Sequence, residues 1–178
     1  IVRQLILNEY PGVPLIIAGH SLGSMMVQDM LIQDSSRWDL AIMMSSRGGR
    51  PNLSERALEL VVLFQFLIKG GRSPATWTDY LIMQSFARLI GEGENRSAWT
   101  SRDLEAIAAY NNDPMMNFTP SARHWFDHAK FLKSRARVTN IARVRADLPI
   151  LLVAGSDDAM GKNGDAVRAL AADYRTTG

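Results

Sequence analysis

The sequence predicts an α/β fold in which parallel strands alternate with helices and a long, all-helical insertion interrupts the sheet. Three short runs, 13–18, 40–44 and 149–154, are apolar throughout. Continuous apolar runs of this length are typical of parallel strands that helices cover on both faces. A helical pattern over 24–33 lies between the first two runs, so we expect a βαβ unit there.

Each remaining element is predicted from its apolar spacing and from the residues that interrupt it. A helical pattern opens the chain, and Pro11 and Gly12 end it just before the first strand. After the second strand, a loop of Ser, Gly and Arg residues leads into successive helical patterns without a convincing strand. The predicted helices cover 1–10, 24–33, 54–69, 76–90, 101–110, 120–133, 138–145 and 163–177.

These elements divide the chain into three parts. Residues 1–51 form the first part of an α/β core, 52–147 form the helical insertion, and 148–178 form the second part of the core. The 178 residues suffice for a sizeable core, and the hydrophobic fraction of 47% is ordinary for a globular protein.

Composition excludes several function classes. The formal net charge of +2 is too small to indicate nucleic-acid binding. The sequence has no cysteine, which excludes disulfides, thiolate metal sites and cysteine nucleophiles and fits a reducing compartment. No apolar run reaches the roughly 20 residues of a membrane span, and Ile1 does not open a basic and apolar leader. We therefore expect a cytoplasmic protein that contacts a membrane surface at most transiently.

The strongest chemical signal is the pentapeptide Gly19-His20-Ser21-Leu22-Gly23, which joins the first strand to the following helix. A tight strand-to-helix turn exposes the Ser21 hydroxyl above the sheet, where a base can activate it. The two glycines leave room for neighbouring elements, and the N–H of Leu22 points from the helix start toward a developing oxyanion. This context predicts a nucleophilic serine.

The second signal is the pair Asp157-Asp158, which follows the strand at 149–154. An acid that orients a catalytic histidine needs a fixed position at a strand end, and this pair has one. An aspartate that only forms a turn is the alternative. His124 and His128 lie four residues apart on one face of a predicted helix, but no third ligand accompanies them. We therefore predict no metal site and no organic cofactor.

At these positions the sequence resembles the α/β-hydrolase family, and within it the monoacylglycerol lipase, lysophospholipase and serine aminopeptidase-like group. The resemblance spans nearly the whole chain and is specific at three places. These are Tyr10-Pro11-Gly12-Val13-Pro14 with Ile16 to Ser24, the stretch Asn112-Asp113-Pro114, and Leu148 to Asp158.

The resemblance implies an α/β-hydrolase fold of which this chain holds only a part. It implies that the acid is Asp158 rather than Asp157, that His20 packs beside the nucleophile, and that the insertion is a cap over the substrate pocket. The family's catalytic histidine corresponds to a position beyond Gly178, and its second oxyanion donor to one before Ile1. We therefore expect the chain, expressed alone, to hydrolyse esters poorly.

These observations favour a serine hydrolase that cleaves carboxylic esters, either small or lipid-like, such as a lysophospholipid or a monoacylglycerol. An aminopeptidase-like amidase remains open, with Glu92, Glu94 and Glu105 as candidate ligands for a substrate amine. A non-catalytic scaffold is the third alternative. The aromatic and methionine side chains of the insertion suit either an acyl-chain pocket or an ordinary helical core.

Overall fold

A computed structural model describes residues 2–48, 53–90, 97–116, 118–135, 138–159 and 161–177. The elements of the core are α1 (Val2–Glu9), β1 (Ile16–His20), α2 (Leu22–Asp34), β2 (Leu40–Met44), β3 (Ile150–Val153) and α8 (Asp165–Thr177). Between β2 and β3 lie α3 (Leu53–Lys69), α4 (Thr76–Ile90), α5 (Leu104–Asn112), α6 (Ala122–Arg135) and α7 (Val138–Ile141). Short 3-10 turns, η1 (Ser35–Arg37) and η2 (Ala98–Thr100), complete the described elements.

The three strands form one parallel sheet in the order β1-β2-β3, which confirms the predicted parallel α/β architecture. The first strand lies later in the chain than predicted, at 16–20 instead of 13–18. Its limits follow those of its partner, because Ile16 pairs with Leu40 and His20 pairs with Met44. The carbonyl of Leu15 still accepts from the N–H of Asp39 at 2.9 Å, but the N–H of Leu15 donates to the side chain of Asp39, at 2.6 Å, so the backbone ladder begins here.

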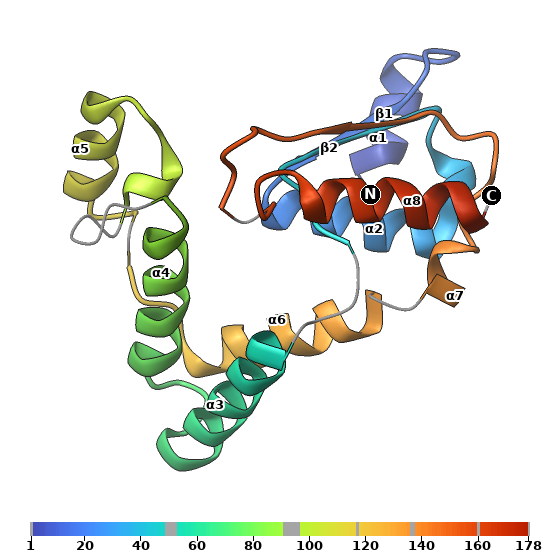
Figure 1. Ribbon diagram of the computed structural model, residues 1–178. Helices are drawn as coiled ribbons and strands as arrows, with labels where there is room; N and C mark the ends of the chain where they lie inside the picture. The colour runs from blue at the N-terminus through green and yellow to red at the C-terminus, as the bar shows by residue number, and fades with distance from the viewer. Residues whose placement is uncertain are drawn as a thin grey trace.

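The main core lies between the sheet and the two helices α2 and α8, which run along one side of it (Figure 1). Strand residues Ile17, Ala41 and Met43 are buried there against Val27 and Leu31 of α2. Burial of a Leu or Val side chain contributes about 1.5–3 kcal/mol, so this apolar contact is a main source of the core's stability.

On the other face of the sheet, large apolar side chains are exposed. Successive strand residues point to opposite faces, so the neighbours of the buried ones share this second face. Ile16, Leu151 and Val153 are exposed there over about half of their surface (55%, 51% and 45%). The described residues therefore cover only one face of the sheet fully.

The segment between β2 and β3 is helical, as predicted, and forms a separate lobe beside the sheet (Figure 1). Helix α3 packs against α4 and α6, and Phe66 stacks on Phe126 with ring centroids 4.5 Å apart. Gln65 is fully buried between helices, where it accepts hydrogen bonds from the N–H and hydroxyl of Thr78. Within the described part of 54–133, the β-pairing is limited to one isolated bridge between Pro74 and Ser121.

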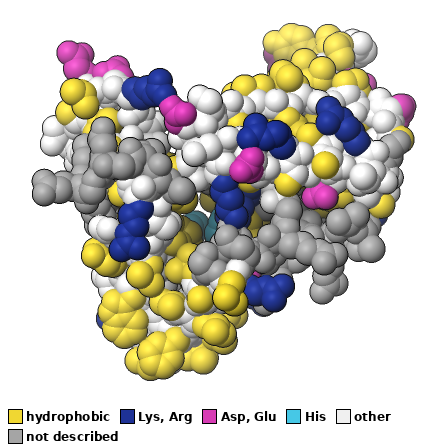
Figure 2. All heavy atoms as spheres, viewed as in Figure 1, with side chains coloured by type: hydrophobic (Ala, Val, Ile, Leu, Met, Phe, Trp, Pro, Cys, Tyr) yellow, Lys and Arg dark blue, Asp and Glu magenta, His cyan; other side chains and the backbone are white. Residues whose placement is uncertain are grey.

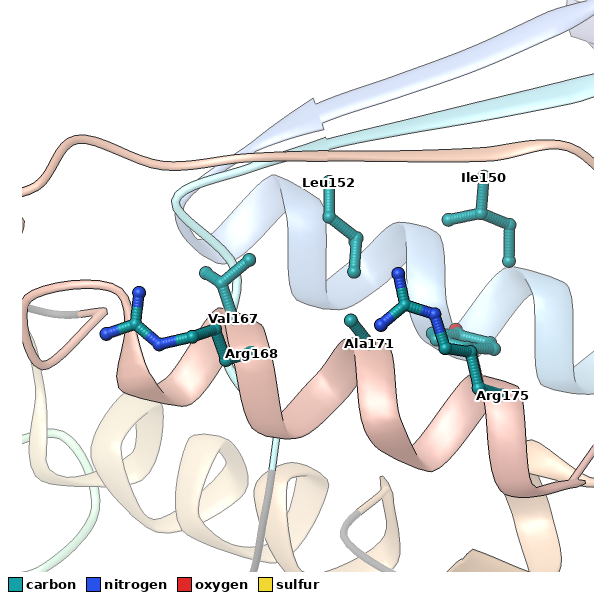
Figure 3. A pocket seen from close by; sticks show the side chains of 7 residues that line it. Ile150, Leu152, Val167, Arg168, Ala171 and Arg175 are labelled. Carbon is teal, nitrogen blue, oxygen red and sulfur yellow. The ribbon is translucent and has the colours of Figure 1, made fainter.

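The chain returns to the sheet before β3, where α7 packs against α8 and Val144 joins the main core. A hollow of about 560 Å³ lies between β3 and α8, with Leu152 pointing from the strand toward Ala171 of the helix and Ile150 toward the part of the helix that carries Arg175 (Figure 3). No described helix combines the length and the apolar character that crossing a membrane requires.

Candidate active site

Ser21 forms the whole turn between β1 and α2. Strand β1 continues to His20 and α2 begins at Leu22, so the predicted turn over 19–23 is reduced to one residue. Ser21 has φ 54° and ψ −122°, a conformation that non-glycine residues seldom adopt. Its N–H extends the ladder by donating to the carbonyl of Met44 at 3.0 Å, and its carbonyl accepts from Ser24 N–H at 3.0 Å. Strain of this kind costs of order 1–3 kcal/mol and is concentrated at functional sites.

Of the two flanking glycines, only Gly19 is required by close packing. A Cβ at Gly19 would lie 2.4 Å from the carbonyl oxygen of Gly23 and 2.7 Å from Ser24 N. A Cβ at Gly23 would meet no described atom within 4 Å, so the expectation that both positions exclude a side chain is wrong for Gly23. The difference arises because Gly19 faces the first turn of α2 while Gly23, within that helix, faces open space.

Leu22 is the first residue of α2, and the first N–H groups of a helix have no partner within it. Its position at the positive end of the helix suits it to stabilise an oxyanion that forms on a group bonded to Ser21. The helix is held to the edge of the sheet by Gln28, whose side chain donates to Ser46 Oγ at 2.7 Å and to Arg47 O at 3.2 Å. Both Gln28 and Ser46 are buried, so this contact ties the middle of α2 to the loop after β2.

Asp158 follows β3 at the sheet edge where Ser21 follows β1. The two strands lie on either side of β2, so their ends are separated by two strand spacings, or roughly 10 Å. Ser45, at the end of β2 between them, also has a positive φ, of 49°, and donates its N–H to Val153 O at 2.8 Å. An imidazole ring that bonds to both a serine and an aspartate requires the two side chains at one edge of the sheet, and β1 and β3 end at the same edge.

The two aspartates of the acid loop have different environments. Asp158 Oδ1 accepts a hydrogen bond from Gly161 N–H at 3.1 Å, while its Oδ2 is buried and has no hydrogen-bond partner among the described residues. Asp157 is 61% exposed and forms an ion pair with Arg102, which precedes α5. Burying a carboxylate oxygen without a hydrogen-bond donor costs free energy, so Asp158 Oδ2 is suited to accept a hydrogen bond from an N–H group.

The histidines of the chain lie on two elements. His20 is an exposed residue at the end of β1. His124 and His128 share a face of α6, as their spacing predicts, and their rings stack with centroids 6.2 Å apart. Trp125 contacts both rings edge-on. No group of three or more His, Asp or Glu side chains in the described part of the chain is arranged to hold a metal ion.

Two features of the site were not visible in the sequence. The ion pair between Arg102 and Asp157 joins residues 55 positions apart, and no local pattern announces such a partner. The strained backbone of Ser45 follows from the end of β2 rather than from a turn motif. Of the three glutamates considered for an amine ligand, Glu105 is exposed on α5, and Glu92 and Glu94 lie outside the described residues.

Comparison with known families gives the context of this geometry. A family model described as serine aminopeptidase, S33, matches residues 1–177. The chain belongs to this family of α/β hydrolases. A search of curated proteins finds no match.

Several solved structures share the fold. A thermostable carboxyl esterase from Bacillus coagulans, in complex with glycerol, superposes with a TM-score of 0.83 at 25% identity over 99% of this chain. A lipase in an open form has a TM-score of 0.80 at 23% identity, also over 99% of this chain. The monoacylglycerol lipase of Paleococcus ferrophilus has a TM-score of 0.55 at 14% identity over 93% of this chain. This S33-family chain spans 57–58% of the length of those three proteins.

Proposed function

We propose that this chain carries the nucleophile and the acid of a serine hydrolase that cleaves carboxylic esters. The observation that carries the proposal is that a strained Ser21 at a strand-to-helix turn and a buried carboxylate oxygen of Asp158, without a partner among the described residues, follow strands that end at the same sheet edge. The likeness to a carboxyl esterase at 25% identity supports an ester as the substrate.

In the proposed reaction, Ser21 Oγ attacks the ester carbonyl carbon while a histidine accepts the hydroxyl proton. The N–H of Leu22 donates to the oxygen that becomes negatively charged, and Asp158 Oδ2 accepts from the histidine and holds its orientation. The alcohol then leaves with the proton, and water repeats the sequence on the acyl-enzyme. We propose that this histidine lies outside the 178 residues, as the resemblance to the α/β-hydrolase family implies.

The substrate class that we propose is small esters or lipid-like esters such as lysophospholipids and monoacylglycerols, taken up in part from a membrane surface. The helical insertion would serve as a cap that contacts the acyl part, with the core formed by residues 1–51 and 148–178. The lack of cysteine in the sequence supports a cytoplasmic setting. Nothing in the proposed reaction requires a metal or an organic cofactor.

A second candidate reaction, amide hydrolysis at a peptide N-terminus, is favoured by the family description itself, serine aminopeptidase. Such an enzyme needs a carboxylate that binds the free amine of its substrate. Kinetics on matched substrates separate the two reactions, and preferential cleavage of aminoacyl anilides over acyl esters would favour the amidase.

The deciding experiment is fluorophosphonate labelling of the full-length protein, followed by hydrolysis of p-nitrophenyl esters and aminoacyl p-nitroanilides. We expect Ser21→Ala to abolish labelling and to lower kcat for esters by on the order of 10⁴ to 10⁶. Ser45→Gly removes a hydroxyl at the same sheet edge and keeps its positive φ accessible, so it should label normally. Labelling that survives in Ser21→Ala would refute the assignment, and a full-length protein that is never labelled would favour a scaffold.

A further inference from the structure

A large apolar surface is exposed on helices α3 and α4, away from the candidate active site. Leu60 and Leu67 of α3 are 68% and 69% exposed, and Phe64 between them is 57% exposed. Apolar side chains exposed to this extent on one helix face mark an interaction surface. We define the apolar patch as Leu60, Phe64, Leu67 and Ile68 of α3 with Trp77 and Leu81 of α4, all exposed.

The patch is a continuous, ordered surface rather than a set of scattered side chains. The ring of Phe64 stacks on that of Trp77 with centroids 6.4 Å apart, which joins the two helices at the surface. Figure 2 shows hydrophobic side chains gathered over the lower end of the helical lobe, where α3 lies in Figure 1. Besides the stack of Phe64 on Trp77, α3 contacts its neighbours through residues outside the patch, Gln65 toward α4 and Phe66 toward α6.

The charges around the patch indicate what it binds. Between residues 60 and 84 the sequence holds two cations, Lys69 and Arg72, and one carboxylate, Asp79. Asp79 is buried and Glu59, which precedes Leu60, is half-buried, whereas Lys69 and Arg72 are exposed, so the fully exposed charges beside the patch are positive. Lys69 Nζ lies 4.1 Å from the ring centroid of Trp77, which places a cation at the border of the apolar surface.

We propose that the apolar patch docks on the surface of an anionic phospholipid bilayer. The side chains of the patch match the layers of a membrane interface. Aliphatic side chains insert among the acyl chains, aromatic rings lie at the level of the headgroups, and basic residues bind the phosphates. A second copy of the chain is a poorer partner, because a symmetric dimer through this surface would bring its cations close to their own counterparts. The proposal concerns binding alone, so it stands independently of the proposed hydrolysis.

The test is co-sedimentation of the full chain with vesicles of phosphatidylcholine alone and of phosphatidylcholine mixed with phosphatidylglycerol, at low and high salt. The variant Phe64→Gln with Leu67→Gln should weaken binding about tenfold or more on both vesicles. Lys69→Gln and Arg72→Gln should each weaken binding about fivefold, and only on the anionic vesicles. High salt should abolish this second difference.

A matched control changes, in the same way, two apolar side chains outside the patch that are at least as exposed as Phe64 and Leu67. Leu104 and Met115 are 75% and 78% exposed, so Leu104→Gln with Met115→Gln removes similar surface. If the control weakens vesicle binding as much as the patch variant does, the proposal is overturned. Failure of the wild type to bind either kind of vesicle also overturns it. The proposal is also overturned if the wild type sediments as a dimer and the variant Phe64→Gln with Leu67→Gln sediments as a monomer, because a second copy of the chain then covers the patch.

Discussion

Gly19→Ala is expected to damage both the fold and the proposed nucleophile. The new Cβ would lie 2.4 Å from the carbonyl oxygen and 2.5 Å from the carbonyl carbon of Gly23. Carbon atoms in contact prefer 3.5–4.0 Å, so the start of α2 must move by about 1 Å. The atoms in the way are backbone, and no rotamer change can remove the clash.

Overpacking of this kind costs about 1–3 kcal/mol, and a clash with backbone belongs at the upper end of that range. For a chain of this size, 3 kcal/mol lowers the melting temperature by about 6–12 °C. Because Ser21 lies two residues from the substitution, its hydroxyl should also move, and fluorophosphonate labelling should fall together with stability.

The matched control for this prediction is Gly23→Ala. A Cβ at this position meets no described atom within 4 Å, and the residue lies within α2. Alanine favours a helix over glycine by about 1 kcal/mol, so this variant should be as stable as the wild type or slightly more stable. Urea denaturation of both variants measures the difference, and an equal loss of unfolding free energy in the two would refute the steric argument.

Three further predictions concern single side chains. Asp158→Asn should keep the fold and lower kcat for esters by about 10³- to 10⁴-fold. Asp157→Asn should change kcat by less than about threefold, because the carboxylate of Asp157 is exposed. If Asp157→Asn had the larger effect, the roles of the two aspartates would be exchanged. Gln65→Leu should lower the unfolding free energy by about 1–3 kcal/mol in thermal denaturation, because it leaves buried donors of α4 without an acceptor, and unchanged stability would contradict this. Hydrogen bonds from the Ser36 hydroxyl and from Arg37 lower the pKa of Asp34. The wild type should therefore be more stable than Asp34→Asn above the unfolded pKa of about 3.9, and this difference should vanish as pH falls through the lower native pKa. A stability difference that does not depend on pH would contradict this prediction.

The core of the fold could be predicted because its signals are local. The run at 40–44 matches β2 residue for residue, since its continuous apolar side chains are visible in the local sequence. The limits of β1 could not be predicted in this way, because they depend on the length of β2 and on the side chain of Asp39. The ends of a strand are set by its pairing with distant segments of the chain, and the local sequence does not reveal which segments pair.

The candidate site shows the same division. The motif around Ser21 contains its own geometry, since a strand, a strained residue and a helix follow one another directly. The contrast between Asp157 and Asp158 depends instead on Arg102, a residue of the insertion, and on a loop that folds back to Gly161. The open surroundings of Gly23 likewise depend on which elements lie nearby, which the pentapeptide alone cannot show.

The two ends of the helical insertion leave and rejoin the sheet at neighbouring strands, since Ala41 pairs with Ile150. About 100 residues thus form a closed loop whose entropic cost grows only with the logarithm of its length. Halving or doubling that loop would change the cost of pairing β2 with β3 by only about 0.6 kcal/mol. Evolution can therefore lengthen, shorten or exchange this lobe with little penalty to the sheet, and the edge that carries Ser21 can be retained while the helices beside it are replaced.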